Sequence, residues 1–260
     1  MVLYFMDYYE NELFASIRPA GRRPAARNDP RRAWVTACMT TVGLIGSGRI
    51  GGTVAKLAVA AGHPVILSNS RGPQTLADLA AGLGPLARAG TGQEAAEAGG
   101  LIVVTIPMRA FQDVPAGPLA GKVVMDTCNY YPQRDGQIPG LDSGALTSSE
   151  LIQRHLARSM LVKVFNNIFF KHLESLARPS GAPDRSFLPI AGDDPAAKAA
   201  VTAFLDSIGY GAVDAGPLAE GWRQQPGTPV YGVPYGPFDD ERGTPASAGT
   251  VREALAAASR

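Results

Sequence analysis

The chain has 260 residues, of which 45% are hydrophobic and 18% charged, and its formal net charge at pH 7 is +1. This length is enough for one large or two small domains with a real core. The near-neutral charge gives no general reason to expect a nucleic acid or a membrane as partner. Cys38 and Cys128 form neither a metal-ligand pattern nor a disulfide framework, so we predict no metal site and a cytoplasmic protein. No apolar run approaches the roughly 18 residues that a membrane-spanning helix requires.

The first 38 residues differ from the rest, because they are rich in Arg, Pro and Ala and lack apolar periodicity. Such a segment cannot bury enough surface to fold alone, and it lacks the apolar core and cleavage site of a secretory signal. We expect residues 1–38 to be a disordered or non-native extension. A targeting arm or a basic interaction tail is the alternative. Met39 opens the first predicted element, so an upstream start assignment would explain the residues before it.

A glycine-rich turn follows a short apolar strand at residues 41–45. Its glycines have Gly-x-Gly-x-x-Gly spacing, and the turn leads directly into a helical pattern. The first glycine permits a tight turn, the second lets backbone approach a pyrophosphate, and the third lets the helix pack on the strand. The helix N-terminus adds N–H groups that attract negative charge. The residues predicted to hold a dinucleotide here are Gly46, Ser47, Gly48, Arg49, Ile50 and Gly51.

The sequence around this turn indicates a βαβ unit. Apolar residues recur at helical spacing from Ile50 to Ala61, and Gly62 stands where a left-handed C-cap is expected. A second apolar strand follows at residues 65–67. Strand, glycine turn, helix and strand within about 30 residues are the context that the dinucleotide fingerprint requires. The alternative is a glycine-rich turn in another kind of α/β domain.

The choice of cofactor depends on the residues that follow the second strand. NAD sites usually carry Asp or Glu about 20 residues beyond the glycines, and here no carboxylate is present. An arginine and three neutral hydrogen-bonding side chains suit a 2′-phosphate, with Arg49 as a second nearby cation. We therefore predict NADP; the alternative is a polar loop with a solvated arginine. The predicted contacts are Ser68, Asn69, Ser70 and Arg71.

Strands and helices keep alternating, which predicts a doubly wound α/β (Rossmann) parallel sheet with a smaller C-terminal α/β lobe. We assign residues 39–167 to the nucleotide-binding domain, and residues 168–260 to a lobe with a short terminal helix and a Pro/Gly-rich cover, formed by residues 216–223 and 226–237. Thr147 and Glu150 predict a capping box for a helix that ends at residue 157. The other expected helices cover residues 75–83, 93–98, 195–208 and 251–260, and the expected strands cover residues 85–88, 101–106, 122–126, 160–165, 187–191 and 212–214.

Ligands of such sheets bind outside the carboxyl ends of the strands. Three predicted strands are followed by polar loops, and we expect these loops to lie together near the nicotinamide end of the cofactor. Ordinary turn chemistry of Asn and Asp is the alternative for each loop. Lys163, in the strand before the last of these loops, is a further candidate. The predicted site residues in the loops are Thr105, Ile106, Pro107, Asn129 and Asn166.

These motifs together resemble the coenzyme F420-dependent NADP oxidoreductases. The resemblance rests on the glycine turn, the segment Ser68–Pro73, and the runs Val-Val-Thr-Ile-Pro and Val-Lys-Val-Phe-Asn-Asn. It implies hydride transfer between NADP(H) and a deazaflavin or flavin-type coenzyme such as F420. It also implies phosphate contacts from Gly46 to Ile50, 2′-phosphate contacts from Ser70 and Arg71, and a nicotinamide loop from Thr105 to Pro107.

Hydride transfer between stacked rings depends on positioning and on excluding water, so we name no catalytic acid or base. His63, His155 and His172 are expected to be structural or surface residues.

Two alternatives stay open: an NADPH-dependent imine or carbonyl reductase, which resembles pyrroline-carboxylate reductases in its first domain, and a non-catalytic NADP-binding sensor. The expected partner is a small-molecule redox partner, and a homodimer stays open. Four aromatic residues of the cover either stack on a flat ring or pack the lobe: Trp222, Tyr231, Tyr235 and Phe238.

Overall fold

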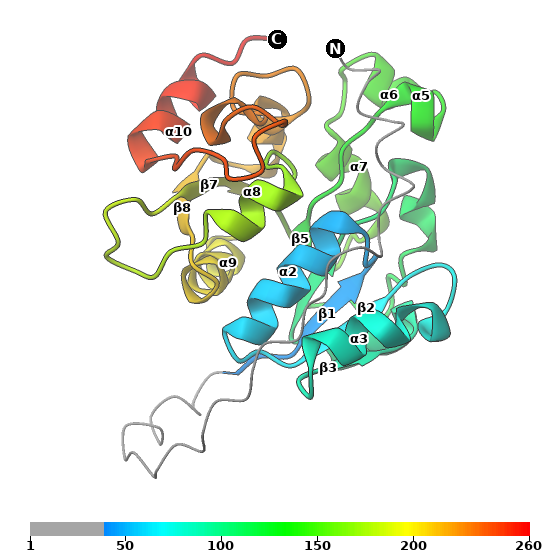
Figure 1. Cartoon of the computed structure of the whole chain (residues 1–260). Helices are drawn as coiled ribbons and strands as arrows, with labels where there is room; N and C mark the ends of the chain where they lie inside the picture. Colours follow the sequence, from blue (N-terminus) through cyan, green and yellow to red (C-terminus); the bar gives the residue numbers. More distant parts are fainter. Residues whose placement is uncertain (1–38) are drawn as a thin grey trace. The chain divides into compact units, whose positions relative to one another are not determined.

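The computed structural model describes residues 39–260, and the predicted extension 1–38 lies outside the described residues. The described residues form an eight-stranded sheet with the strand order β3-β2-β1-β4-β5-β6-β7-β8, and Figure 1 shows it from one side. The order reverses between β1 and β4, which is where doubly wound sheets bind their ligands. The strands are β1 (Val42–Ile45), β2 (Val65–Ser68), β3 (Ala87–Ala89), β4 (Leu101–Val104), β5 (Val123–Asp126), β6 (Met160–Lys163), β7 (Phe187–Gly192) and β8 (Gly211–Asp214).

All neighbouring strands of this sheet are parallel except β6 and β7. The predicted doubly wound α/β fold is confirmed, and the expectation of a wholly parallel sheet is corrected at this one junction. There Val162 lies opposite Gly192 and Lys163 opposite Ala191, with the strands running in opposite directions. Apolar periodicity predicts that a segment is a strand but carries no information about its direction.

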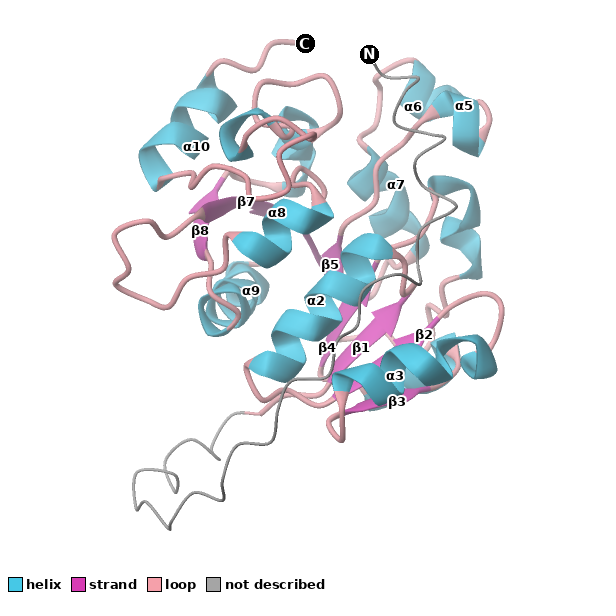
Figure 2. Ribbon diagram, in the orientation of Figure 1, coloured by secondary structure: helices cyan, strands magenta, loops and turns pink. Residues whose placement is uncertain are grey.

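Helices cover both faces of the sheet, and α2 and α3 cover one face of β1 to β3 in Figure 2. Because successive side chains of a strand point to opposite faces, Leu44 joins the core on the α2 side and Ile45 the core on the α4 side. The α-helices and 3₁₀ helices are α2 (Arg49–Ala60), η2 (Pro73–Leu76), α3 (Ala77–Leu83), α4 (Gly92–Ala98), η3 (Met108–Asp113), α5 (Pro132–Asp135), α6 (Pro139–Asp142), α7 (Ser148–His155), α8 (Phe170–Ser175), α9 (Pro195–Ser207), η4 (Leu218–Gln224), η5 (Val233–Tyr235) and α10 (Ala248–Ala256).

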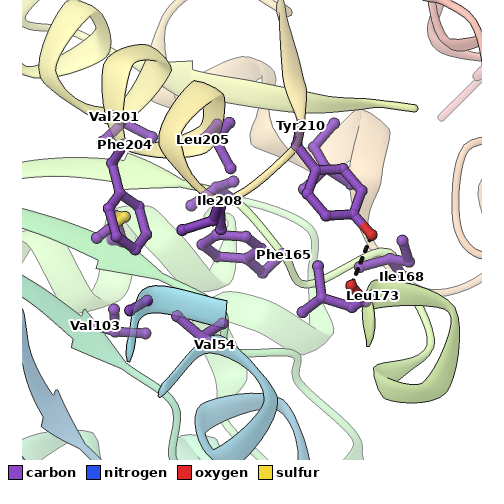
Figure 3. Packing of buried hydrophobic residues seen from close by; sticks show 14 of the residues in the cluster. Val54, Val103, Phe165, Ile168, Leu173, Val201, Phe204, Leu205, Ile208 and Tyr210 are labelled. Carbon is purple, nitrogen blue, oxygen red and sulfur yellow. Dashed lines mark hydrogen bonds between the residues drawn. The ribbon is translucent and has the colours of Figure 1, made fainter. Parts of the chain in front are cut away.

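The two predicted parts of the chain share one hydrophobic core. Figure 3 shows Val54 of α2 and Val103 of β4 in the same cluster as Phe204 of α9. In the same view Tyr210 donates a hydrogen bond to the carbonyl of Leu173 at 2.7 Å. Residues 39–260 accordingly pack as one unit, and the boundary placed at residue 167 stays a prediction.

Several predicted boundaries shift by a few residues. The expected strand at 85–88 is β3, Ala87–Ala89, and the expected strand at 160–165 ends at Lys163. The helix after Thr147 ends at His155 rather than at residue 157. Its capping box is confirmed: Thr147 Oγ1 accepts from the amide of Glu150, and Glu150 Oε2 accepts from the amide of Thr147.

Candidate functional site

The glycine turn packs tightly against the end of β4. Gly46 has φ +100°, a left-handed conformation that favours glycine. A Cβ at Gly46 would lie 2.1 Å from the carbonyl oxygen of Thr105, and one at Gly51 would lie 2.6 Å from Thr105 Cγ2. Two of the three motif glycines are therefore required by close packing of the turn on the loop after β4.

Gly48 differs, because a Cβ placed there would meet no protein atom within 4 Å. Its φ of −77° and ψ of −157° are open to other residues, and it caps the twelve-residue helix α2 without a side-chain hydrogen bond. Nothing in the protein's own packing requires glycine at this position. An open space at an uncapped helix N-terminus is the geometry that a pyrophosphate requires, so this part of the chain fits a dinucleotide.

The loop after β2 divides its side chains between holding the loop and facing solvent. Ser68 is buried and donates to the carbonyl of Leu44 at 2.6 Å. Asn69 Oδ1 accepts from the amide of Arg71 at 2.9 Å, which fixes the turn. Ser70 and Arg71 are exposed. These two side chains are the ones available to a 2′-phosphate, whereas Ser68 and Asn69 shape the loop.

Three other predicted residues of the turn have contacts within the protein. Ser47 Oγ donates to the carbonyl of Ser68 at 3.0 Å, which joins the glycine turn to the end of β2. Ile50 is partly buried against the core. The guanidinium of Arg49 lies 5.1 Å from the centre of the Phe170 ring. Arg49 thus contacts α8, and its predicted role beside a 2′-phosphate stays a prediction.

The loop after β4 lies directly beside the glycine turn. The amide of Thr105 donates to the carbonyl of Ile45 at 2.9 Å, which continues the pairing of β4 with β1. Pro107 has φ −59° and precedes η3. Thr105, Ile106 and Pro107 are all partly buried. The structure therefore brings this predicted loop to the glycine turn, at the position where the strand order reverses.

Asn129 and Asn166 pair across the ends of β5 and β6. Asn129 Nδ2 donates to the carbonyl of Asn166 at 2.8 Å, and Asn166 Nδ2 donates to Asn129 Oδ1 at 3.0 Å. Phe165, directly before Asn166, has φ +65° and is the one non-glycine with positive φ among residues 39–260. Such a conformation costs about 1–3 kcal/mol and persists only where the surroundings hold it. The pairing of the two asparagines is part of what holds it.

Sequence reasoning missed Gln224, at the end of η4. Its carbonyl accepts from Asn166 Nδ2 at 2.6 Å, so it joins the asparagine pair. The Gln224 side chain is fully buried, and neither of its polar atoms has a hydrogen-bond partner; Asn166 Oδ1 also has none. The segment around Gln224 has no apolar periodicity, so no sequence signal could have placed it here.

The four aromatic residues of the cover have different surroundings. Tyr235 is fully buried in the core, so it packs the lobe. Phe238 stacks on His172 with an interplanar angle of 3°. Trp222 lies under the guanidinium groups of Arg223 and Arg260. Tyr231 contacts Tyr131 in the loop after β5 through its hydroxyl group. Tyr231 therefore reaches the loop after β5, whereas Tyr235 accepts from Asn167 Nδ2 at 3.5 Å in the loop after β6.

The three histidines have hydrogen-bond partners within the fold. A ring nitrogen of His63 lies 3.1 Å from the carbonyl oxygen of Thr40. The corresponding distances are 2.8 Å from His155 to the carbonyl oxygen of Val114 and 2.5 Å from His172 to that of Asp240.

Among residues 39–260, no three His, Cys, Asp or Glu side chains gather as a metal site would require. Over the same residues, no helix has the length and apolar character needed to cross a membrane.

Comparison with known proteins identifies the first part of the chain. The family model described as NADP oxidoreductase, coenzyme F420-dependent, matches residues 41–130. The match covers this segment, which is less than half of the chain. The matched residues include the glycine turn, the loop after β2, the loop after β4 and Asn129. For residues 41–130, this match confirms the family resemblance predicted from the motifs.

Two individual proteins are also similar to this chain. The protein YjhV of Escherichia coli (strain K12) is 42% identical over 53 residues, which are 20% of this chain and 39% of YjhV. The match thus spans about two fifths of that protein. The solved structure of SMa0349 from Sinorhizobium meliloti is 26% identical, with a TM-score of 0.66, and the alignment covers 78% of this chain and 97% of that protein.

Two more distant structures share the fold. A provisionally assigned F420-dependent NADP reductase from Arthrobacter sp. FB24 has a TM-score of 0.57 at 24% identity, covering 69% of this chain and 86% of its own. An imine reductase from Pseudomonas sp. has a TM-score of 0.50 at 17% identity, and the alignment covers 76% of this chain and 59% of the imine reductase. These similarities support the Rossmann-type fold of the family.

Proposed function

We propose that this protein binds NADP(H) at the glycine turn and transfers a hydride between NADP(H) and a deazaflavin or flavin-type coenzyme such as F420. The observation that supports NADP(H) binding is the open space at Gly48, at the N-terminus of α2, which no side chain caps. The match of residues 41–130 to the NADP oxidoreductase family model supports it. The choice of F420 as the second coenzyme follows the description of the matched family, which names coenzyme F420.

Each part of the site would act on a different part of the cofactor. Amides at the start of α2 would hold the pyrophosphate, and Ser70 with Arg71 would hold the 2′-phosphate. The loop from Thr105 to Pro107 and the Asn129–Asn166 pair would flank the nicotinamide ring. The bound cofactor supplies a hydride donor or acceptor, and the protein's contribution is to hold two flat rings in contact and to exclude water.

The cover contributes to water exclusion in this proposal. Residues 226–237 are joined to both strand-end loops, because the amide of Gly232 donates to the carbonyl of Asn167 at 2.9 Å and Tyr231 pairs with Tyr131. A segment anchored at two loops can cover the nicotinamide end while the phosphate end stays accessible. Exchange of the second coenzyme would then require these contacts to open.

The direct test mixes purified protein, NADPH and oxidised F420 and follows the visible absorbance of F420 over time. We expect F420 to be reduced with NADPH and far more slowly with NADH. Binding of NADPH without reduction of F420 or of a flavin would contradict the proposed reaction while leaving the cofactor assignment intact. Failure to bind NADPH at all would contradict both.

One observation favours an NADPH-dependent imine or carbonyl reductase as the second candidate. Reduction of a C=N or C=O bond consumes a proton as well as a hydride, and a phenol can donate it. Tyr131, on the loop after β5, has such a hydroxyl group: a phenol is protonated at neutral pH, and burial moves the pKa of Tyr131 further up. NADPH oxidation with a panel of cyclic imines and ketones, compared between wild type and Tyr131→Phe, separates this candidate from the first. NADPH binding without turnover on any acceptor would indicate a sensor.

A further inference from the structure

A buried ion pair joins β5 to β6, and none of the roles assigned above uses it. Asp126 and Lys163 lie opposite each other in the register of the two strands. Both side chains are fully buried, and Lys163 Nζ lies 3.5 Å from Asp126 Oδ2. Removing two charges from water is costly, so a buried pair is weak evidence for a role in stability alone.

The hydrogen bonds of this pair converge on one residue of the loop after β5. Lys163 Nζ donates to the carbonyl of Cys128 at 3.0 Å, and the amide of Cys128 donates to Asp126 Oδ1 at 2.8 Å. Both backbone polar groups of Cys128 are therefore held by the ion pair. The loop cannot shift here without breaking a hydrogen bond to a buried charge, and such bonds are among the stronger ones in proteins.

Two neighbouring elements fix the lysine in turn. Ser149 Oγ donates to Asp126 Oδ2 at 2.6 Å, and Lys163 Nζ lies 3.3 Å from Ser148 Oγ, so the start of α7 closes one side. On another side, a Cβ at Gly221 of η4 would lie 3.1 Å from Lys163 Cδ. The ammonium group thus has one position, and that position reaches Cys128.

Asn129 follows Cys128 directly, and its side chain pairs with Asn166. We propose that Lys163 is a positioning residue for the nicotinamide end of the site: it acts through Cys128 to hold Asn129 against Asn166. The inference rests on the proposed function for its ligand. It extends that function by assigning a role to a residue that does not itself face the cofactor.

The test removes both charges at once, so that no uncompensated charge stays buried. In the double variant Lys163→Met/Asp126→Asn, the new amide at position 126 can still accept from the amide of Cys128, whereas Met cannot donate to its carbonyl. Val201→Ala, a buried site on α9, is the control for a general loss of stability. If the double variant does not fold, Lys163→Gln/Asp126→Asn takes its place, because the shorter Gln can bond to the new side chain at position 126 without reaching Cys128.

Two ligands separate positioning from general damage: NADPH, and 2′-phospho-ADP-ribose, which lacks the nicotinamide. We expect the double variant to bind 2′-phospho-ADP-ribose like the wild type and NADPH about tenfold more weakly, the effect of losing roughly one hydrogen bond. Val201→Ala should change neither affinity. An equal loss for both ligands, or no loss for either, would overturn the inference.

Amide hydrogen exchange of residues 127–131 gives a readout that needs no ligand. We expect faster exchange there in the double variant and unchanged exchange in Val201→Ala. Unchanged exchange in the double variant would overturn the inference even if the affinities fell. If the wild type bound neither nucleotide, the proposed function would fail, and the exchange data would still decide whether Lys163 holds the loop.

Discussion

The hydroxyl groups of Tyr131 and Tyr231 lie 2.5 Å apart, although the two residues are 100 positions apart in the chain. Tyr131 belongs to the loop after β5, and Tyr231 to the Pro/Gly-rich cover. Two residues before Tyr131, Asn129 pairs with Asn166, and one residue after Tyr231, the amide of Gly232 bonds to Asn167. The cover is therefore attached to both loops that we assign to the nicotinamide end.

Removing this contact should loosen the cover. We expect Tyr231→Phe to lower the free energy of unfolding by about 1 kcal/mol, the usual net value of one hydrogen bond, and to speed amide exchange across residues 226–237. Tyr130→Phe is the matched control, because the Tyr130 hydroxyl bonds to Gly136 and Asp142 instead. Equal exchange in wild type and Tyr231→Phe would show that the tyrosine pair does not hold the cover.

In the proposed function, the preference for NADP over NAD depends on Arg71. Arg71→Ala should weaken NADPH binding about 10- to 100-fold, because a hydrogen bond to a charged group contributes roughly 1.5–3 kcal/mol. NADH binding should stay unchanged. Arg88→Ala, which removes an exposed arginine from the neighbouring strand β3, controls for the loss of positive charge. Titrations of both variants with both nucleotides measure the difference, and an equal loss for NADPH and NADH after Arg71→Ala would refute the assignment.

Stability should fall at alkaline pH because two phenols are deeply buried. Burial raises the pKa of Tyr210 and of Tyr235 well above the usual value of 10.0. In the unfolded chain both ionise near pH 10, whereas in the folded chain they stay protonated, so the folded state binds more protons. The free energy of unfolding should therefore decrease above pH 10, by up to about 1.4 kcal/mol per pH unit for each phenol.

Tyr235→Phe isolates one of these contributions. Urea unfolding between neutral pH and pH 11 should show a smaller decrease for the variant than for the wild type. At neutral pH the variant should be less stable, because the Tyr235 hydroxyl donates to the carbonyl of Phe187 at 2.9 Å. Parallel pH profiles for the two proteins would contradict this account of Tyr235.

The fold could be predicted wherever apolar periodicity and glycine position determine it. The βαβ unit, the central strands and the capping box at Thr147 all depend on short-range patterns that can be recognised in the amino-acid sequence. The reversed direction of β7 could not be predicted, since it depends on how the chain from Val164 to Ser186 returns to the sheet. The end of β6 at Lys163 could not be predicted either, because a Phe at position 165 does not indicate a left-handed backbone conformation.

The candidate site divides in the same way. Asn129 and Asn166 could be expected together, because both follow parallel neighbouring strands and the carboxyl ends of such strands meet at one edge. Gln224 and the partner of Tyr131 come from η4 and from residues 226–237, where proline and glycine remove any periodic pattern. Their place in the fold is set by tertiary contacts, because η4 packs on β6, β7 and α7, and Tyr231 contacts Tyr131 in the loop after β5.

The central claim is that the space over Gly48 is reserved for a ligand and not for the protein itself. The most direct measurement compares NADPH affinity in Gly48→Ala and Gly52→Ala, since a Cβ at either glycine meets no protein atom within 4 Å. Both variants should keep the stability of the wild type to within about 0.5–1 kcal/mol. We predict that Gly48→Ala loses NADPH affinity by at least about tenfold and that Gly52→Ala keeps it. Wild-type affinity in Gly48→Ala would contradict the account.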